Sequence, residues 1–161
     1  MSPHGGTTIT IRLPRSREPL PATAAPGDAS SAPPVSARIL LVEDNPQVAD
    51  VTSQMLRAMG FQVEVTDRAR KALDRLEREA EGIDLLLTDV VLPDGLNGIE
   101  LAARVRTRWP ALPIVVTSGY NDVAPPDGLT LPVLRKPVPY DDLHRAICAA
   151  LEAHAGLIPL A

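Results

Sequence analysis

The sequence predicts an α/β domain in which a parallel β-sheet is covered by helices on both faces. Short runs such as 39–42 and 83–88 are apolar almost throughout, which is typical of strands buried on both sides. Between these runs, apolar residues recur at helical spacing. Apolar residues make up 45% of the chain but aromatic residues only 2%, so the core must consist of aliphatic side chains. Right-handed crossovers narrow this pattern to a doubly wound sandwich.

The individual elements follow in order. After strand 39–42, Asp44-Asn45-Pro46 offers a helix N-cap and a first-turn proline, and Gly60 ends that helix. Further strands are predicted at 61–65, 113–117 and 132–134. The apolar faces of the helices are predicted to consist of Val48, Val51, Met55 and Met59, then Ala69, Ala72, Leu73 and Leu76, and in the last helix Tyr140, Leu143, Ile147 and Leu151. One more helix is predicted at 98–108.

The chain divides into a tail, a domain and a short C-terminal tail. Residues 1–36 hold seven of the 17 prolines and little large apolar surface, so we expect a disordered leader there, although the alternating stretch 7–13 can also form a strand. The domain is expected at 37–155 and the second tail at 156–161. Only about eight residues follow the last predicted helix, so no DNA-binding output domain is expected.

Bulk properties exclude several classes of protein. A net charge of −4 and a pI near 5.3 do not suggest nucleic-acid binding. There is no run of about 18 apolar residues and no apolar signal segment, so neither membrane insertion nor secretion is expected. Cys148 is the only cysteine, which fits a reducing compartment. These features predict a cytoplasmic protein.

Polar residues gather where the predicted strands end. Glu43 and Asp44 follow the first strand, Asp89 the third, Ser118 the fourth, and Lys136 the fifth. In doubly wound sheets, the carboxyl ends of the strands hold the functional site. Taken singly, the acids can be helix caps or solvated strand ends.

Together, these residues predict phosphoryl chemistry. Three converging carboxylates repel one another unless a cation joins them, and carboxylate oxygens with water suit Mg²⁺. Lys136 and Ser118 can hold phosphoryl oxygens, and Asp89 can act as a nucleophile that forms an aspartyl phosphate.

The series of motifs Leu-Val-Glu43-Asp44-Asn, Leu-Leu-Thr-Asp89-Val-Val-Leu-Pro, Thr-Ser118-Gly-Tyr and Arg-Lys136-Pro resembles two-component response regulator receiver domains (CheY-like) over residues 38–153. Its motif style is similar to that of receivers in hybrid histidine kinases and of stand-alone receivers. The resemblance implies a flavodoxin-like five-stranded fold with strand order 2-1-3-4-5. It also implies that a histidine kinase or phosphotransfer protein phosphorylates Asp89.

The resemblance further implies roles for single residues. Asp44, Asp89 and the backbone carbonyl of Val91 match the family's Mg²⁺ ligands, and Glu43 matches a ligand acting through water. Ser118 and Lys136 match the phosphoryl-binding hydroxyl and lysine. The peptide bond before Pro137 is expected to be cis, and many receivers form homodimers, so a dimer is possible here.

Two features depart from the family pattern. Val133 stands where the family often has an aromatic switch residue, with Tyr120 as a candidate substitute. Pro125-Pro126 and Gly128 predict a shortened or irregular fourth helix, and make the segment 119–131 the expected output surface.

Two alternatives stay open. A pseudo-receiver would keep the fold as a phosphorylation-independent binding module. The other alternative is a Mg²⁺-dependent phosphatase-like enzyme, although such enzymes have a second acidic residue two positions after the nucleophile, where this chain has Val91. The leading interpretation is a signalling domain that catalyses only its own phosphorylation and dephosphorylation, and that switches an unknown downstream protein.

Overall fold

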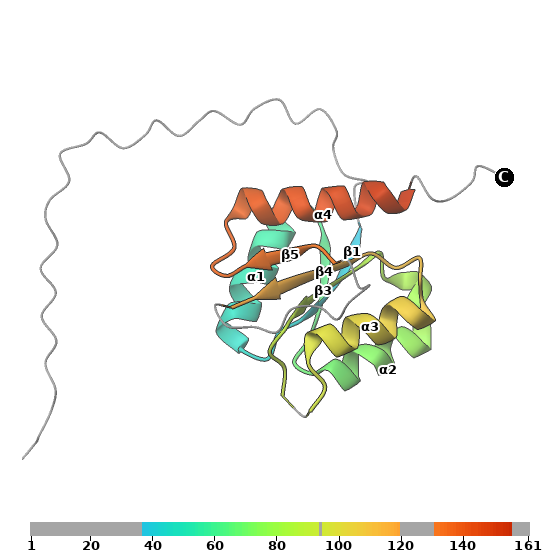
Figure 1. Ribbon diagram of the computed structural model, residues 1–161. Helices are drawn as coiled ribbons and strands as arrows, with labels where there is room; N and C mark the ends of the chain where they lie inside the picture. The colour runs from blue at the N-terminus through green and yellow to red at the C-terminus, as the bar shows by residue number, and fades with distance from the viewer. Residues whose placement is uncertain (1–36, 94, 120–130, 156–161) are drawn as a thin grey trace, which may run out of the picture. The chain divides into compact units, whose positions relative to one another are not determined.

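The computed structural model describes residues 37–93, 95–119 and 131–155. Strands and helices alternate along these residues (Figure 1). The strands are β1 Arg38–Val42, β2 Gln62–Thr66, β3 Leu85–Asp89, β4 Ile114–Ser118 and β5 Val133–Arg135. The helices are α1 Pro46–Ala58, α2 Ala69–Glu79, α3 Gly98–Arg108 and α4 Tyr140–Ala155, with a 3₁₀ turn η1 at Ala80–Gly82.

The five strands form one sheet in the order β2-β1-β3-β4-β5, and every pairing is parallel. The flavodoxin-like order predicted from the sequence is therefore confirmed. Strands β2, β4 and β5 each begin one residue later than predicted, because the apolar run that marks a strand extends into the preceding turn: Phe61 is buried but precedes β2. Strand β3 begins two residues later and ends one residue later than predicted, so Asp89 is its last residue and pairs with Thr117 of β4.

The strands bury side chains on both faces of the sheet. Alternate residues of β1 point to opposite sides, so Leu40 packs with α2 and α3 while Leu41 packs with α1 and α4. Each face thus has its own apolar cluster, and Figure 1 shows α2 and α3 together on one side of the sheet and α4 on the other. The central strands β1, β3 and β4 are apolar almost throughout because helices cover both of their faces, whereas the edge strands β2 and β5 are partly exposed.

The starts of α1 and α3 are fixed by asparagine caps. The Asn45 side chain, rather than that of Asp44, accepts hydrogen bonds from the first-turn amides of α1, which leaves Asp44 available for the site. Asn97 caps α3 and forms a capping box with Glu100. The prediction that Val51 lies on the buried face of α1 is wrong, because its side chain is 57% exposed.

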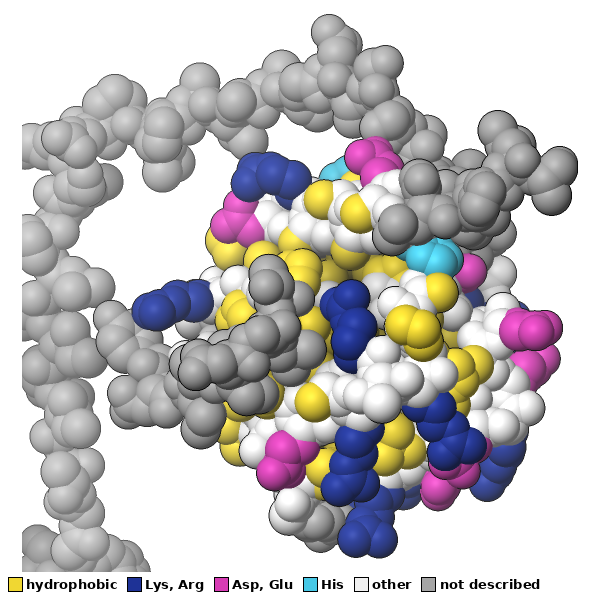
Figure 2. Space-filling model, turned by 45° about the vertical axis from the view of Figure 1, so that its right-hand side comes forward, with side chains coloured by type: hydrophobic (Ala, Val, Ile, Leu, Met, Phe, Trp, Pro, Cys, Tyr) yellow, Lys and Arg dark blue, Asp and Glu magenta, His cyan; other side chains and the backbone are white. Residues whose placement is uncertain are grey.

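The face shown in Figure 2 carries Lys and Arg side chains in its lower half, interspersed with acidic ones. An ion pair joins two helices: Arg108 Nη1 of α3 lies 2.7 Å from Glu77 Oε1 of α2. The predicted irregular fourth helix and Tyr120 lie outside the described residues. Within the described part of the chain, no helix combines the length and apolarity needed to cross a bilayer.

Candidate functional site

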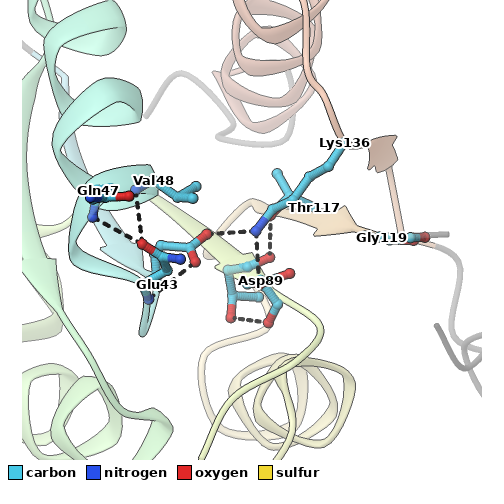
Figure 3. Close-up of polar contacts among 10 residues, drawn as sticks. Glu43, Gln47, Val48, Asp89, Thr117, Gly119 and Lys136 are labelled. Carbon is cyan, nitrogen blue, oxygen red and sulfur yellow. Dashed lines mark hydrogen bonds and ion pairs between the residues drawn. The ribbon is translucent and has the colours of Figure 1, made fainter. Parts of the chain in front are cut away.

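Three strand ends bring together the charged residues singled out in the sequence. Glu43 follows β1, Asp89 ends β3, and Lys136 follows β5. The ammonium of Lys136 donates to Glu43 Oε2 at 2.7 Å and to Asp89 Oδ2 at 2.8 Å. Figure 3 shows the lysine side chain reaching between the two carboxylates. Residues 93 and 47 positions apart in sequence therefore form one ionic network.

Lys136 is held in its charged form. Burial alone would lower the pKa of this ammonium, but its hydrogen bonds to Asp89 and Glu43 outweigh burial, so its pKa lies above the ordinary value. The lysine side chain is 26% exposed, which leaves the site open to a ligand on one side.

Glu43 is the carboxylate whose charged form is opposed by burial. Its side chain is only 4% exposed, and burial raises its pKa above the usual range despite the hydrogen bond and the charge from Lys136. The negative charge of Asp89 raises it further. The charged form of Glu43 is therefore stabilised by Lys136 against the effect of burial.

Asp44 completes an acidic cluster. One carboxylate oxygen from each of Glu43, Asp44 and Asp89 lies within 4.8 Å of the other two. Glu43 and Asp89 are buried, whereas Asp44 is exposed at the rim. The cluster has three carboxylates and one neighbouring ammonium, that of Lys136, so its net charge is negative. All of its possible metal ligands are oxygen atoms, which suits a hard divalent cation such as Mg²⁺.

The backbone of Asp89 is fixed by neighbours that the sequence did not single out. The Thr88 hydroxyl donates to the Asp89 carbonyl at 3.0 Å, and the Gly98 amide donates to the Val90 carbonyl at 2.8 Å. A Cβ on Gly98 would collide with the Asp89 carbonyl oxygen and lie 2.7 Å from its carbon. The start of α3 therefore packs directly on the backbone of Asp89. The only sequence signal was a glycine at a predicted helix start.

The remaining predicted residues lie around this centre. Ser118 ends β4 and is half-buried, and its hydroxyl donates to the Gly119 carbonyl at 3.1 Å. The Val91 side chain is 59% exposed beyond the end of β3. The Lys136–Pro137 peptide bond is cis, as the resemblance implies.

Comparison with known proteins identifies the family. The model of the response regulator receiver domain matches residues 39–147, so the chain belongs to that family. The chain is 36% identical over 89 residues to the response regulator protein FleR of Pseudomonas aeruginosa. This alignment covers 55% of the chain and 18% of FleR. It is 38% identical over 84 residues to the transcriptional regulatory protein CreB of Escherichia coli. That alignment covers 52% of the chain and 35% of CreB.

Solved structures agree. A response regulator receiver protein from Sinorhizobium medicae matches with a TM-score of 0.65 at 27% identity, covering 74% of this chain and 97% of that one. A receiver domain protein from Clostridium thermocellum matches with a TM-score of 0.70 at 24% identity, covering 76% and 99%, and supports the fold. The chain spans well under half the length of FleR and of CreB.

Proposed function

We propose that this receiver accepts a phosphoryl group on Asp89 from a histidine kinase or a histidine phosphotransfer protein, and that phosphorylation switches its binding to a downstream protein. The observation that carries this proposal is the position of Lys136, whose ammonium contacts Asp89 at 2.8 Å and Glu43 at 2.7 Å. A structural ion pair needs one carboxylate, whereas this lysine contacts two carboxylates that belong to a cluster of three.

Asp89, Lys136 and Ser118 have different roles in the proposed phosphoryl transfer. The Asp89 carboxylate attacks the phosphorus, a P–O bond forms, and the P–N bond to the donor imidazole breaks. Lys136 is already charged and 2.8 Å from the nucleophile, so it can hold a phosphoryl oxygen once the carboxylate charge of Asp89 is replaced by the negative charge of the phosphoryl group. The Ser118 hydroxyl, at the neighbouring strand end, is the second proposed contact.

The acidic cluster fits Mg²⁺, which we propose is bound by Asp44, Asp89 and the Val91 carbonyl, with Glu43 assisting. When bound, this ion neutralises charge on the carboxylates and on the phosphoryl oxygens. Glu43 also has a separate task, because its buried carboxylate holds the ammonium of Lys136.

A groove beside the site supplies a surface for the phosphodonor. It is lined by the site residues Glu43 and Lys136 and by apolar residues of α1, including Val48 and Val51. A donor histidine must reach Asp89 from outside, and a protein seated on these apolar side chains would bring it there. The exposure of Val51, unexpected from the sequence, is consistent with this use.

The test is incubation with Mg²⁺ and acetyl phosphate, followed by intact mass spectrometry. We expect a gain of one phosphoryl group, and none for Asp89→Asn. A matched control is Asp84→Asn: Asp84 precedes β3 at the opposite end of the same strand, where it accepts from the Arg38 amide at 2.6 Å. If the wild type gains no phosphoryl group, the pseudo-receiver interpretation replaces this one.

A further inference from the structure

Strand β3 is buried along its whole length, yet one of its residues carries a hydroxyl. Thr88 is 0% exposed and stands immediately before the proposed phosphoacceptor Asp89. Burying a hydroxyl is costly unless it is hydrogen-bonded, and valine would fill nearly the same space without that cost. The Thr88 hydroxyl donates to the backbone carbonyl of Asp89 at 3.0 Å. The proposed phosphoryl transfer does not use this hydroxyl.

The Thr88 hydroxyl lies where β3, β4 and α3 meet. Its oxygen is 3.0 Å from the position that a Cβ on Gly98, the first residue of α3, would take. The Thr88 carbonyl accepts a hydrogen bond from the Thr117 hydroxyl of β4 at 3.4 Å. Threonine is also branched at Cβ, which restricts its rotamers. The hydroxyl is therefore held against the Asp89 carbonyl by the packing around it.

Hydrogen bonds hold two consecutive peptide units beyond the end of β3. The unit that joins Asp89 to Val90 is held at its carbonyl by Thr88 and at its amide, which donates to a carbonyl of β4 at 2.9 Å. The next unit, from Val90 to Val91, is held at its carbonyl by the Gly98 amide at 2.8 Å. Because each peptide unit is planar, the torsions of Val91 itself are then the ones left to set the direction of its carbonyl.

We propose that Thr88 is a positioning residue for the metal site, because its hydroxyl fixes the backbone that presents the Asp89 carboxylate and the Val91 carbonyl to Mg²⁺. This inference rests on the proposed function, which assigns both groups to the ion. Without the hydroxyl, the Asp89 carbonyl loses this donor, and its peptide unit can turn about the remaining bond to β4. Mg²⁺ requires nearly ideal octahedral geometry, so displaced ligands weaken its binding even where the fold persists.

Titration of the whole 161-residue chain with Mn²⁺ tests the proposal. Mn²⁺ binds the same kinds of oxygen ligand as Mg²⁺, and the paramagnetic resonance signal of the free ion measures binding directly. The wild type should bind one ion that excess Mg²⁺ displaces and that Asp89→Asn binds much more weakly. We expect Thr88→Val to weaken Mn²⁺ binding by about tenfold, since losing an outer-shell partner of a metal site costs about 10- to 100-fold.

Further variants separate the hydroxyl from packing. Thr88→Ser and Thr88→Ala both lack the methyl group and differ only in the hydroxyl, so serine should bind Mn²⁺ like the wild type and alanine like valine. This comparison also holds if valine is not tolerated. The matched control is Ser53→Ala, which removes another buried hydroxyl, one that donates to the Ala49 carbonyl at 2.6 Å within α1. It should lower stability in urea unfolding without changing Mn²⁺ affinity.

The outcomes distinguish this inference from the proposed function. Wild-type affinity in Thr88→Val, equal weakening in Thr88→Ser and Thr88→Ala, or equal weakening in Ser53→Ala would overturn the positioning role. The proposed function would survive each of these results, provided that the wild type gains a phosphoryl group from acetyl phosphate. A wild type that binds no Mn²⁺ would instead overturn the proposed metal site, and the role of Thr88 with it.

Discussion

Gly98 sets how closely α3 packs on the phosphoacceptor, and Gly98→Ala tests that role. The added Cβ would lie 2.7 Å from the Asp89 carbonyl carbon and closer still to the carbonyl oxygen, whereas ordinary contact begins near 3.4 Å, so one backbone must move by more than about 0.7 Å. Neither side yields easily, because the Gly98 amide is bonded to Val90 and the Asp89 carbonyl to the Thr88 hydroxyl. Overpacking of this kind costs about 1–3 kcal/mol, more than the gain of about 1 kcal/mol from replacing glycine in a helix.

The functional effect should exceed the effect on stability. A displacement of about 1 Å at a reacting group can cost about a hundredfold in rate, so we expect Gly98→Ala to slow phosphorylation by acetyl phosphate by about ten- to a hundredfold. The assay is the rate of phosphoryl gain by intact mass, alongside urea unfolding.

The matched control is Gly60→Ala. Gly60 has φ 94° and open space around its Cα, so alanine there costs about 1–2 kcal/mol of backbone strain far from the site. This variant should lose stability yet phosphorylate normally. Wild-type rates in Gly98→Ala, or equal slowing in both variants, would refute the positioning role.

Three further predictions concern charge and capping. Lys136→Met leaves the buried carboxylate of Glu43 without its cation and should lower unfolding free energy at pH 8 by about 2–3 kcal/mol in a chelator-treated sample. The pKa of Glu43 is raised in the folded state, so the free energy of unfolding falls as pH rises from 4.5 through the raised pKa. In urea unfolding, Lys136→Met should therefore be nearly as stable as the wild type at pH 4 and less stable at higher pH. Asn97→Ala removes the α3 cap and should cost about 1 kcal/mol by the same measurement, with Asn97→Asp as the control that keeps an acceptor. Arg75→Ala breaks contacts of Arg75 Nε to both Glu64 oxygens, at 2.7 and 2.9 Å, and should cost about 1 kcal/mol while leaving the phosphorylation rate unchanged; a slowed rate would contradict the local role of this pair.

Much of the fold was predictable because its signals are local. Runs such as 83–88 are apolar whichever face they meet, and Asn97 with Glu100 forms a capping box within one turn. The errors also have a local origin. Helical spacing alone placed Val51 on the buried face, but the width of that face is set by what packs on it, and the groove beside α1 leaves Val51 exposed.

By itself, the sequence determined the chemistry available at the strand ends, since parallel strands with right-handed crossovers bring their carboxyl ends to one edge. Only the tertiary structure decided how these groups are shared: that Lys136 spans Glu43 and Asp89, that Glu43 is buried while Asp44 stays at the rim, and that α3 begins against the backbone of Asp89. These facts depend on distances between residues far apart in the chain. Pattern and propensity carry no information on such distances, because they are set by the packing of helices on both faces of the sheet.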